Sequence, residues 1–326
     1  MADRAGAIRR IPAARDLPSG LRDGTVAIGN FDGVHLGHRA VLDAALERPG
    51  PHLVLTFEPH PRELFSGQPV FRLTPPEEKA CVLGLSGFDA VIEQPFDRAL
   101  AGLSAEAFID DVLVRDLGAR HVVVGDDFRF GARRAGDAGL LASHGAFDAT
   151  VVPQQAAGGG AVSSSRIRAC LADGRPDEAA ALLGRRWRVA APVLHGRKVG
   201  RTIGYPTANM ALPASAELAH GIYAVRFRRA DGSLHDGVAS HGRRPTFDDG
   251  PPLLETFLFD FGGDLYGETA QVSLFAHLRG EEKFDGVEAL VAQMDRDSEN
   301  ARAVLREAAP LSPIDAALNF PPDLPA

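Results

Sequence analysis

A glycine-rich segment near the amino terminus, Gly29–His38, reads GNFDGVHLGH and carries two histidines three residues apart. It lies where an apolar run gives way to a helical pattern, and backbone N–H groups at a helix start attract phosphate. Gly33 and Gly37 would let a nucleotide approach without a Cβ in the way. His35 and His38 could then hydrogen-bond phosphoryl oxygens and stabilise a pentavalent transition state. A metal pair, which here lacks the H-E-x-x-H spacing of zinc proteases, and two surface histidines are the alternatives.

A second segment, Val162–Arg168, is rich in hydroxyls and reads VSSSRIR. Ser163 and Ser164 stand where the pattern predicts a helix N-cap, and Arg168 follows one turn later. Hydroxyls and a guanidinium so arranged can bind a phosphate through charge-assisted hydrogen bonds. Serines before a helix are usually only a cap, so the functional interpretation requires this segment to meet the histidine segment. A parallel sheet can bring both to one edge.

In the second half, a glycine-rich cationic turn, GRKVGR, precedes the segment GYPTAN. Gly196, Gly200 and Arg201 of the turn could bind nucleotide phosphates. Thr207 and Asn209 then supply a hydroxyl and an amide that can coordinate magnesium and phosphate. The pattern is not a P-loop of the G-x-x-x-x-G-K-[ST] type.

A carboxylate stands within a predicted strand, Leu253–Phe261. The period of two places Glu255, Phe257 and Phe259 on one face. A carboxylate among apolar neighbours suits a general base that takes a proton from an alcohol. A glutamate that simply faces solvent is the alternative.

Apolar β-rich runs alternate with helical patterns in the first half of the chain. The predicted strands are Thr25–Gly29, His52–Phe57, Asp89–Ile92, His121–Gly125 and Ala149–Pro153, and the predicted helices are Arg39–Glu47, Pro76–Leu85 and Ser104–Leu117, the last capped by Ser104. This α/β alternation predicts a parallel sheet covered by helices, with ligands outside the carboxyl ends of the strands.

After a predicted flexible loop, Gln154–Ser165, the pattern changes to a helical pair and then to strands without intervening helices. The predicted helices are Ser164–Ala172 and Asp177–Leu183, and the predicted strands are Val189–Leu194, Ile222–Arg228, Leu234–Ser240, Leu253–Phe261 and Gln271–His277. Asp231-Gly232 supplies the positive φ angles of a hairpin turn. These strands predict an antiparallel β-barrel or sandwich.

The last long element carries apolar residues at helical spacing and is expected to pack against the barrel. They are Val287, Leu290, Val291, Met294, Ala301, Val304 and Leu305. The proline-rich tail from Pro310 to Ala326 is expected to lie over the surface. We place the domain boundary near Arg185, which gives domains 1–185 and 186–326.

Composition narrows the class of protein. A length of 326 residues suggests two domains, and a net charge of −8 argues against a duplex nucleic acid partner. Two cysteines, Cys81 and Cys170, are too few for a disulfide framework and favour a reducing compartment. No secretory signal or membrane-spanning segment is apparent. We therefore expect a cytoplasmic protein, monomeric or weakly homo-oligomeric, with small-molecule partners, no nucleic acid and no membrane.

Four segments occur in a characteristic order: GNFDGVHLGH, TFEPHP (Thr56–Pro61), VGDDFRFG (Val124–Gly131) and SSSRIR. Their order resembles the adenylyltransferase domain of the bacterial bifunctional riboflavin kinase/FMN adenylyltransferases, or FAD synthetases. The resemblance implies a Rossmann-like nucleotidyltransferase domain, in which Asp127, Phe128 and Phe130 belong to the flavin site. Aromatic residues two apart are otherwise more often the core face of a strand.

The second half resembles the riboflavin kinases of the same family. There the threonine and asparagine of GYPTAN bind magnesium and nucleotide, and the glutamate that matches Glu255 is the base for the ribityl 5′-hydroxyl. The chain departs from the family at Ser240-His241, where asparagine before isoleucine or valine is frequent, and at Phe257, where histidine is frequent. These departures bear on flavin affinity in the kinase barrel.

The resemblance implies a bifunctional enzyme that uses Mg²⁺ and ATP to convert riboflavin to FMN, and ATP to convert FMN to FAD. His35, His38, Ser164 and Arg168 would handle phosphates in the second reaction, and Asn30 would help shape that site. Two alternatives remain: a flavin-binding or flavin-sensing protein without turnover, and an enzyme with one active half.

Overall fold

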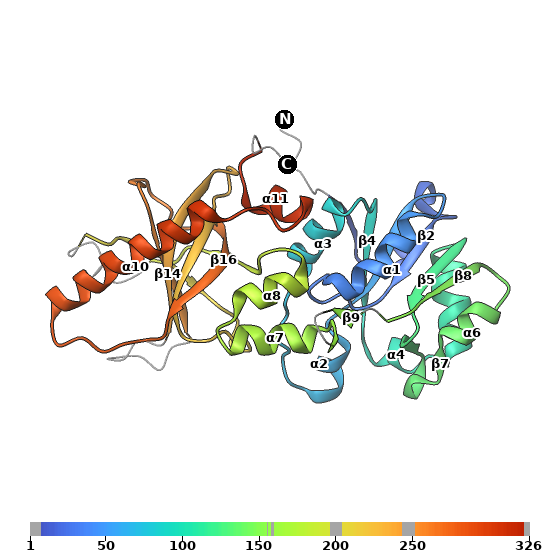
Figure 1. The fold of residues 1–326 in the computed structure, drawn as a ribbon. Helices are drawn as coiled ribbons and strands as arrows, with labels where there is room; N and C mark the ends of the chain where they lie inside the picture. Colours follow the sequence, from blue (N-terminus) through green and yellow to red (C-terminus); the bar gives the residue numbers. More distant parts are fainter. Residues whose placement is uncertain (1–7, 155, 158–159, 196–203, 243–251, 323–326) are drawn as a thin grey trace. The chain divides into compact units, whose positions relative to one another are not determined.

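The computed structural model describes residues 8–154, 156–157, 160–195, 204–242 and 252–322 (Figure 1). The chain divides into two compact units, Met1–Ser164 and Ser165–Ala326. Helices α7 (Ser164–Ala172) and α8 (Pro176–Leu183) have the predicted positions. They fall almost wholly in the second unit, where α8 contacts strand β16 (Thr269–Arg279). The units therefore divide earlier in the chain than the boundary near Arg185 that the sequence favours.

Six described strands of the first unit form a sheet in the order β1-β4-β3-β2-β5-β8. All neighbouring strands are parallel, which confirms the predicted parallel sheet, whereas the strand order was not predicted. They are β1 (Arg9–Ile11), β2 (Thr25–Ile28), β3 (His52–Glu58), β4 (Ala90–Pro95), β5 (His121–Gly125) and β8 (Asp148–Val152). Strand β1 was not among the predicted strands, because it is three residues long and two of its residues are exposed arginines. The parallel pairing brings the carboxyl ends of β2, β3 and β5 to one edge of the sheet.

Helices surround this sheet. They are α1 (Leu36–Leu46), α2 (Pro61–Ser66), α3 (Pro76–Leu85), α4 (Arg98–Ala101), α5 (Ala105–Ala107), η3 (Phe108–Asp116) and α6 (Ala138–Ser143), with short turns η1 (Ala14–Asp16), η2 (Ser19–Leu21) and η4 (Ala132–Arg134). Helix α3 has the predicted bounds. The Ser104 hydroxyl accepts a hydrogen bond from the Ala107 N–H at 3.1 Å, which confirms the predicted cap, but the continuation η3 has π-helical hydrogen bonding.

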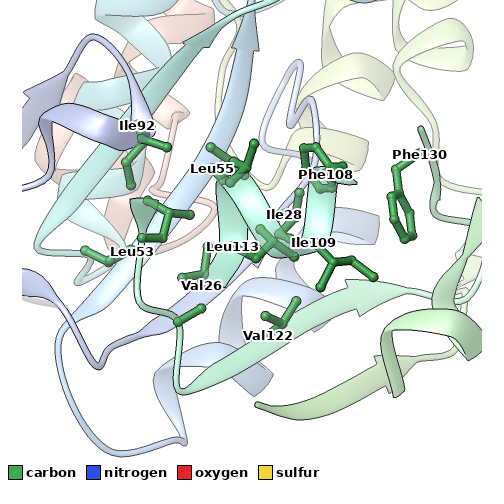
Figure 2. Packing of buried hydrophobic residues seen from close by; sticks show 14 of the residues in the cluster. Val26, Ile28, Leu53, Leu55, Ile92, Phe108, Ile109, Leu113, Val122 and Phe130 are labelled. Carbon is green, nitrogen blue, oxygen red and sulfur yellow. The ribbon is translucent and has the colours of Figure 1, made fainter. Parts of the chain in front are cut away.

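One face of the sheet forms a core with η3 (Figure 2). Alternate residues of β2 and β3, such as Val26, Ile28 and Leu55, pack there against Ile109 and Leu113. The intervening residues of these strands are also fully buried, and α1 contacts β2 and β5. Burial on both faces is why these strands have near-continuous apolar sequences.

The segment Gln154–Ser165, predicted to be a loop, contains further structure. Strands β9 (Ala156–Ala157) and β10 (Gly160–Ala161) pair antiparallel, and α7 begins at Ser164. Another short pair joins β6 (Arg129–Phe130) to β7 (Gly136–Asp137).

The second unit contains an antiparallel sheet in the order β11-β16-β13-β14-β15-β12. Its strands are β11 (Arg188–Pro192), β12 (Thr207–Ala211), β13 (Gly221–Arg228), β14 (Leu234–Gly242), β15 (Leu253–Leu258) and β16. A bridge between Leu194, just after β11, and Asn209 on β12 links the two ends of the sheet. The barrel prediction is confirmed, although β12 was not among the predicted strands.

The turn between β13 and β14 has the predicted position but a different geometry. Gly232 has a φ of +90°, and Asp231 is absent from the residues with positive φ in the described chain. The Asp231 carboxylate instead accepts hydrogen bonds from the N–H and the hydroxyl of Ser233. Aspartate therefore stabilises this turn through its side chain.

Helix α10 (Val287–Glu307) contacts β13, β14 and β16 (Figure 1). Its apolar stripe is buried in the carboxyl-terminal part, at Ala301 and Leu305. Val287 is 60% exposed, so the prediction that the whole stripe packs against the barrel is wrong at its amino-terminal end. Within the described residues, no helix is both long and apolar enough to span a membrane.

The proline-rich tail does not lie over the surface as predicted. It forms helix α11 (Pro313–Asn319), which Ser312 caps, and Phe320 enters the core of the second unit. Asp315 at the start of α11 is fully buried against Arg186. Proline at the first helical position favours the start of a helix, so the tail's composition was compatible with this outcome.

Candidate functional site

The histidine segment forms the connection between β2 and α1, as predicted, and its backbone is strained. Phe31, Gly33 and Val34 have φ values of +47°, +90° and +41°. This left-handed region is unfavourable for residues with a Cβ, and especially for a branched side chain such as that of Val34. Strained backbone persists where surrounding contacts fix it, and such positions cluster at ligand sites.

Two threonines from other elements hold this loop. The Thr74 hydroxyl accepts a hydrogen bond from the Gly33 N–H at 2.8 Å, and the Thr74 N–H donates to the buried Asp32 carboxylate at 3.1 Å. The Thr56 hydroxyl donates to the Asn30 carbonyl at 3.1 Å. Neither threonine has a local sequence pattern that indicates this role, because these contacts join distant segments.

The two histidines stack on each other at the start of α1. Their ring centroids are 3.5 Å apart, with planes 14° from parallel, and Phe31 meets the His38 ring edge-on at 5.3 Å. His35 Nδ1 accepts a hydrogen bond from the His38 N–H at 3.2 Å and so caps the helix. In the neutral ring the proton then lies on Nε2, which can donate to a phosphoryl oxygen.

The serine segment meets the histidine segment, as predicted. The Ser164 hydroxyl donates to the Asp32 carbonyl at 2.7 Å, and Val162 lies against Gly37. A Cβ on Gly37 would stand 2.9 Å from the Val162 carbonyl oxygen and 3.1 Å from the His35 ring. Gly37 is therefore required for packing between the two segments, whereas the sequence predicted that it would leave room for a nucleotide to approach. Ser163 and Arg168 are half-buried.

The predicted flavin residues follow β5, at the same sheet edge as the histidine loop. Phe130 is 7% exposed and packs against Phe108, with ring centroids 5.4 Å apart. Phe128 stacks on Phe130 at 5.6 Å and is half-buried, whereas Asp127 is exposed. Phe130 is therefore a core residue, which leaves Phe128 and Asp127 as the better candidates for direct ligand contact.

In the second unit, sheet register brings together residues far apart in sequence. Asn209 on β12 lies opposite Glu255 on β15, and Glu255 lies opposite Ser240 on β14. Directly opposed residues have Cβ atoms about 5 Å apart on the same face of the sheet. Thr207 shares that face because it is two residues from Asn209. Gly196, Gly200 and Arg201 lie outside the described residues.

The oxygen ligands in this row fit a magnesium ion. Magnesium takes oxygen ligands, and some nucleotide-dependent enzymes hold it through a hydroxyl or a side-chain amide together with the phosphates of the nucleotide. The Asn209 amide nitrogen donates to the Thr207 carbonyl at 3.3 Å, and the metal-binding atom of an amide side chain is its oxygen. Over the described ranges, no group of three or more His, Cys, Asp or Glu residues could hold a metal ion.

Contacts with α10 anchor the start of β12. The Tyr205 ring packs on Phe257, with centroids 4.6 Å apart, and its hydroxyl donates to Asp295 of α10. Burial and this carboxylate raise the pKa of Tyr205 to about 12. Phe257, one of the departures from the family, therefore supports the strand that carries Thr207 and Asn209.

The other departure, His241, is buried. Its Nδ1 lies 3.1 Å from the Ala219 carbonyl, and its Nε2 has no hydrogen-bond partner among the described residues. Burial lowers the pKa of His241, which favours the neutral ring. A polar atom buried in this way costs stability, so His241 is a weak point of the barrel.

Two family models match the chain, one in each half: FAD synthetase over residues 18–166 and riboflavin kinase over residues 183–305. A bifunctional riboflavin kinase/FMN adenylyltransferase of Escherichia coli K12 is 41% identical over 304 residues, covering 90% of this chain and 97% of the relative. The protein of that name from Listeria monocytogenes is 40% identical, covering 85% and 91%. A solved structure titled as a macrolide-efflux protein from Streptococcus pneumoniae has 31% identity and a TM-score of 0.80, covering 92% of this chain and 99% of that one.

Proposed function

This chain belongs to the family of bifunctional riboflavin kinase/FMN adenylyltransferases, and we propose that it converts riboflavin to FMN and FMN to FAD. The observation that carries this proposal is that both halves match, each with its own family model. The near-complete coverage of relatives that bear both names supports two activities on one chain.

In the kinase half, the ribityl 5′-hydroxyl oxygen forms a bond to the γ-phosphorus of ATP, and ADP leaves. We assign Glu255 as the base that takes the hydroxyl proton, because it lies beside Asn209 across the sheet. Thr207 and Asn209 would hold Mg²⁺, which neutralises phosphate charge when bound. Gly196, Gly200 and Arg201 are proposed to bind nucleotide phosphates on sequence grounds.

In the adenylyltransferase half, a phosphate oxygen of FMN attacks the α-phosphorus of ATP, and pyrophosphate leaves. His35 and His38 would stabilise the charge that develops on the phosphoryl oxygens. The short His35–His38 stacking distance supports a joint role, because one ligand group could meet both rings. Positioning and charge neutralisation supply most of the catalysis in such in-line displacements.

The remaining proposed contacts lie around the histidine loop. Asn30, Gly37, Ser163, Ser164 and Arg168 would bind or shape the nucleotide phosphate site. The Asn30 side-chain oxygen is buried and has no hydrogen-bond partner in the part of the chain that the structure describes, so a ligand donor could satisfy it.

Asp127 and Phe128 would contact the flavin of FMN, and Phe130 would support Phe128 from the core. Because Ser164 and Arg168 are assigned to this reaction, we propose functional domains of 1–185 and 186–326. A cytoplasmic location and a monomeric or weakly self-associating state are proposals from composition alone.

A chromatographic assay tests the proposed function. Purified protein is incubated with riboflavin, ATP and magnesium, and in a second reaction with FMN, ATP and magnesium. Accumulation of FMN and then FAD supports two active sites. FAD from FMN without FMN from riboflavin would mean an inactive barrel, and flavin binding without either product would favour a sensor.

A further inference from the structure

A buried cluster of charges lies behind the histidine loop. Lys79 of α3 has a side chain only 3% exposed, and its ammonium donates to the Glu58 carboxylate at 3.2 Å and to the Thr56 hydroxyl at 2.9 Å. Arg72 binds the same carboxylate from the other side. Burial of a lysine to this degree is rare without a partner and suggests that its charge has a specific use.

The chemistry of these groups gives the hydrogen bonds one direction. An ammonium has donors and no acceptor, so the Thr56 oxygen must accept from Lys79. The single hydroxyl hydrogen of Thr56 is then available for the Asn30 carbonyl at 3.1 Å. The result is a directed chain from Lys79 through Thr56 to the backbone of Asn30.

That backbone position begins the strained part of the loop. Asn30 directly precedes Phe31, whose φ is +47°, and the loop continues to the buried His35. Thr74 holds the middle of the loop and Thr56 holds its first residue. Loss of either contact would let the loop relax towards ordinary backbone angles.

We propose that Lys79 is a positioning residue for FAD synthesis, which orients the Thr56 hydroxyl and so fixes the loop that carries His35 and His38. This inference rests on the proposed adenylyltransferase function. A purely stabilising role explains the lysine less well, because apolar residues of similar volume often replace buried ion pairs without loss of stability.

The charge of Lys79 adds a test that depends on pH. Burial and the nearby Arg72 lower the pKa of Lys79, whereas Glu58 and Asp32 raise it, and the net direction is downwards. Arg72 also forms an ion pair with Glu63 of α2, with 3.5 Å between the guanidinium nitrogen and the carboxylate oxygen. Once deprotonated, the Lys79 amine could accept from Thr56, and the hydroxyl would no longer be directed at Asn30.

The experiment compares Lys79→Met, Thr56→Val and their double variant in the full-length protein. We expect kcat/KM for FAD formation from FMN to fall about 10- to 100-fold in each single variant, a range typical of small misplacements. The double variant should fall no further than the worse single one, because both changes break one chain. Riboflavin phosphorylation by the same preparations should change less than about twofold, since the kinase residues lie in the other unit.

Two controls separate positioning from stability. Val82→Ala truncates a buried side chain of the same helix and leaves the hydrogen-bonded residues unchanged, so it should lower the melting temperature and leave kcat/KM intact. In the unaltered protein, kcat/KM should decline at alkaline pH as Lys79 loses its proton. This decline should be absent from Lys79→Met and should move to higher pH in Lys79→Arg, because arginine keeps its charge.

The inference is overturned if Lys79→Met retains kcat/KM for FAD formation within about threefold of the unaltered protein. It is also overturned if Val82→Ala, at the same drop in melting temperature, loses as much activity as Lys79→Met. An alkaline decline that persists unchanged in Lys79→Met would overturn it as well. If the unaltered protein makes no FAD, the proposed adenylyltransferase function fails instead. The two failures are therefore distinguishable.

Discussion

Replacement of Asp315 by alanine is expected to unfold the barrel unit at a clearly lower temperature. This carboxylate is fully buried and accepts hydrogen bonds from the backbone N–H groups of Arg186 at 2.9 Å and Leu311 at 3.0 Å. It also accepts from the Asn319 amide at 2.7 Å and pairs with the Arg186 guanidinium. Asp315 thus joins the tail to the beginning of the barrel.

The size of the effect follows from what Asp315→Ala leaves behind. Removal of one partner of a buried ion pair costs about 3–5 kcal/mol. Arg186 keeps its hydrogen bond to the Ala309 carbonyl at 2.9 Å and its position over the Phe275 ring, so we expect about 3 kcal/mol. For a unit of this size, that corresponds to a drop in melting temperature of about 6–12 °C.

Thermal unfolding followed by circular dichroism measures this drop, and residual riboflavin phosphorylation after heating shows that the barrel is the unit affected. Asp177→Ala is the matched control, because Asp177 stands in the first turn of α8 and is exposed. Its melting temperature should change by no more than about 2 °C. A melting temperature lowered by less than about 2 °C in Asp315→Ala would refute the reasoning. A drop in Asp177→Ala as large as the drop in Asp315→Ala would also refute it.

Further predictions concern the two proposed active sites and the stability of the barrel. Glu255→Gln should abolish FMN formation from riboflavin and spare FAD formation from FMN, and His38→Ala should do the reverse. The two activities are measured in separate assays, and loss of both in either folded variant would contradict independent sites. Gly37→Ala should selectively lower FAD formation from FMN, since its Cβ would meet a carbonyl oxygen at 2.9 Å; unchanged kcat/KM would count against the packing argument. Burial lowers the pKa of His241 in the folded state, so below about pH 6.5 the unfolded chain binds a proton more readily and the free energy of unfolding falls as pH falls. His241→Val should therefore make the melting temperature less sensitive to acid; an unchanged pH dependence would contradict this.

Sequence patterns predicted the sheet of the first unit well because burial on both faces leaves a strong local signal. Strand β5 and helix α3 have the predicted bounds, and β2 and β3 differ by one residue at their ends. The missed strands are short and mixed in composition. Strand β1 depends on β4 for its pairing and β12 depends on β15, so neither has a pattern of its own.

The tail shows a second limit of local reasoning. Its prolines indicated an irregular surface segment, but the Asp315 carboxylate accepts a hydrogen bond from the Arg186 N–H, which is 129 residues away in the sequence. The residues that hold the histidine loop were missed for the same reason. Thr74 and Lys79 act through contacts with segments that lie more than 20 residues away. Residue type alone therefore identified the groups suited to chemistry, but not those that position them.

The register of β15 shows how local and distant information combine at the kinase site. Leu254, Thr256 and Leu258 alternate with Glu255 and are buried, so a slip of one residue would turn these buried side chains outward and Glu255 into the core. The alternation that predicted the face of Glu255 therefore also fixes its register. Its neighbours Asn209 and Ser240 follow from that register once β12 and β14 are known to pair with β15. The sequence could indicate which way the carboxylate faces, whereas only the strand order could indicate what stands beside it.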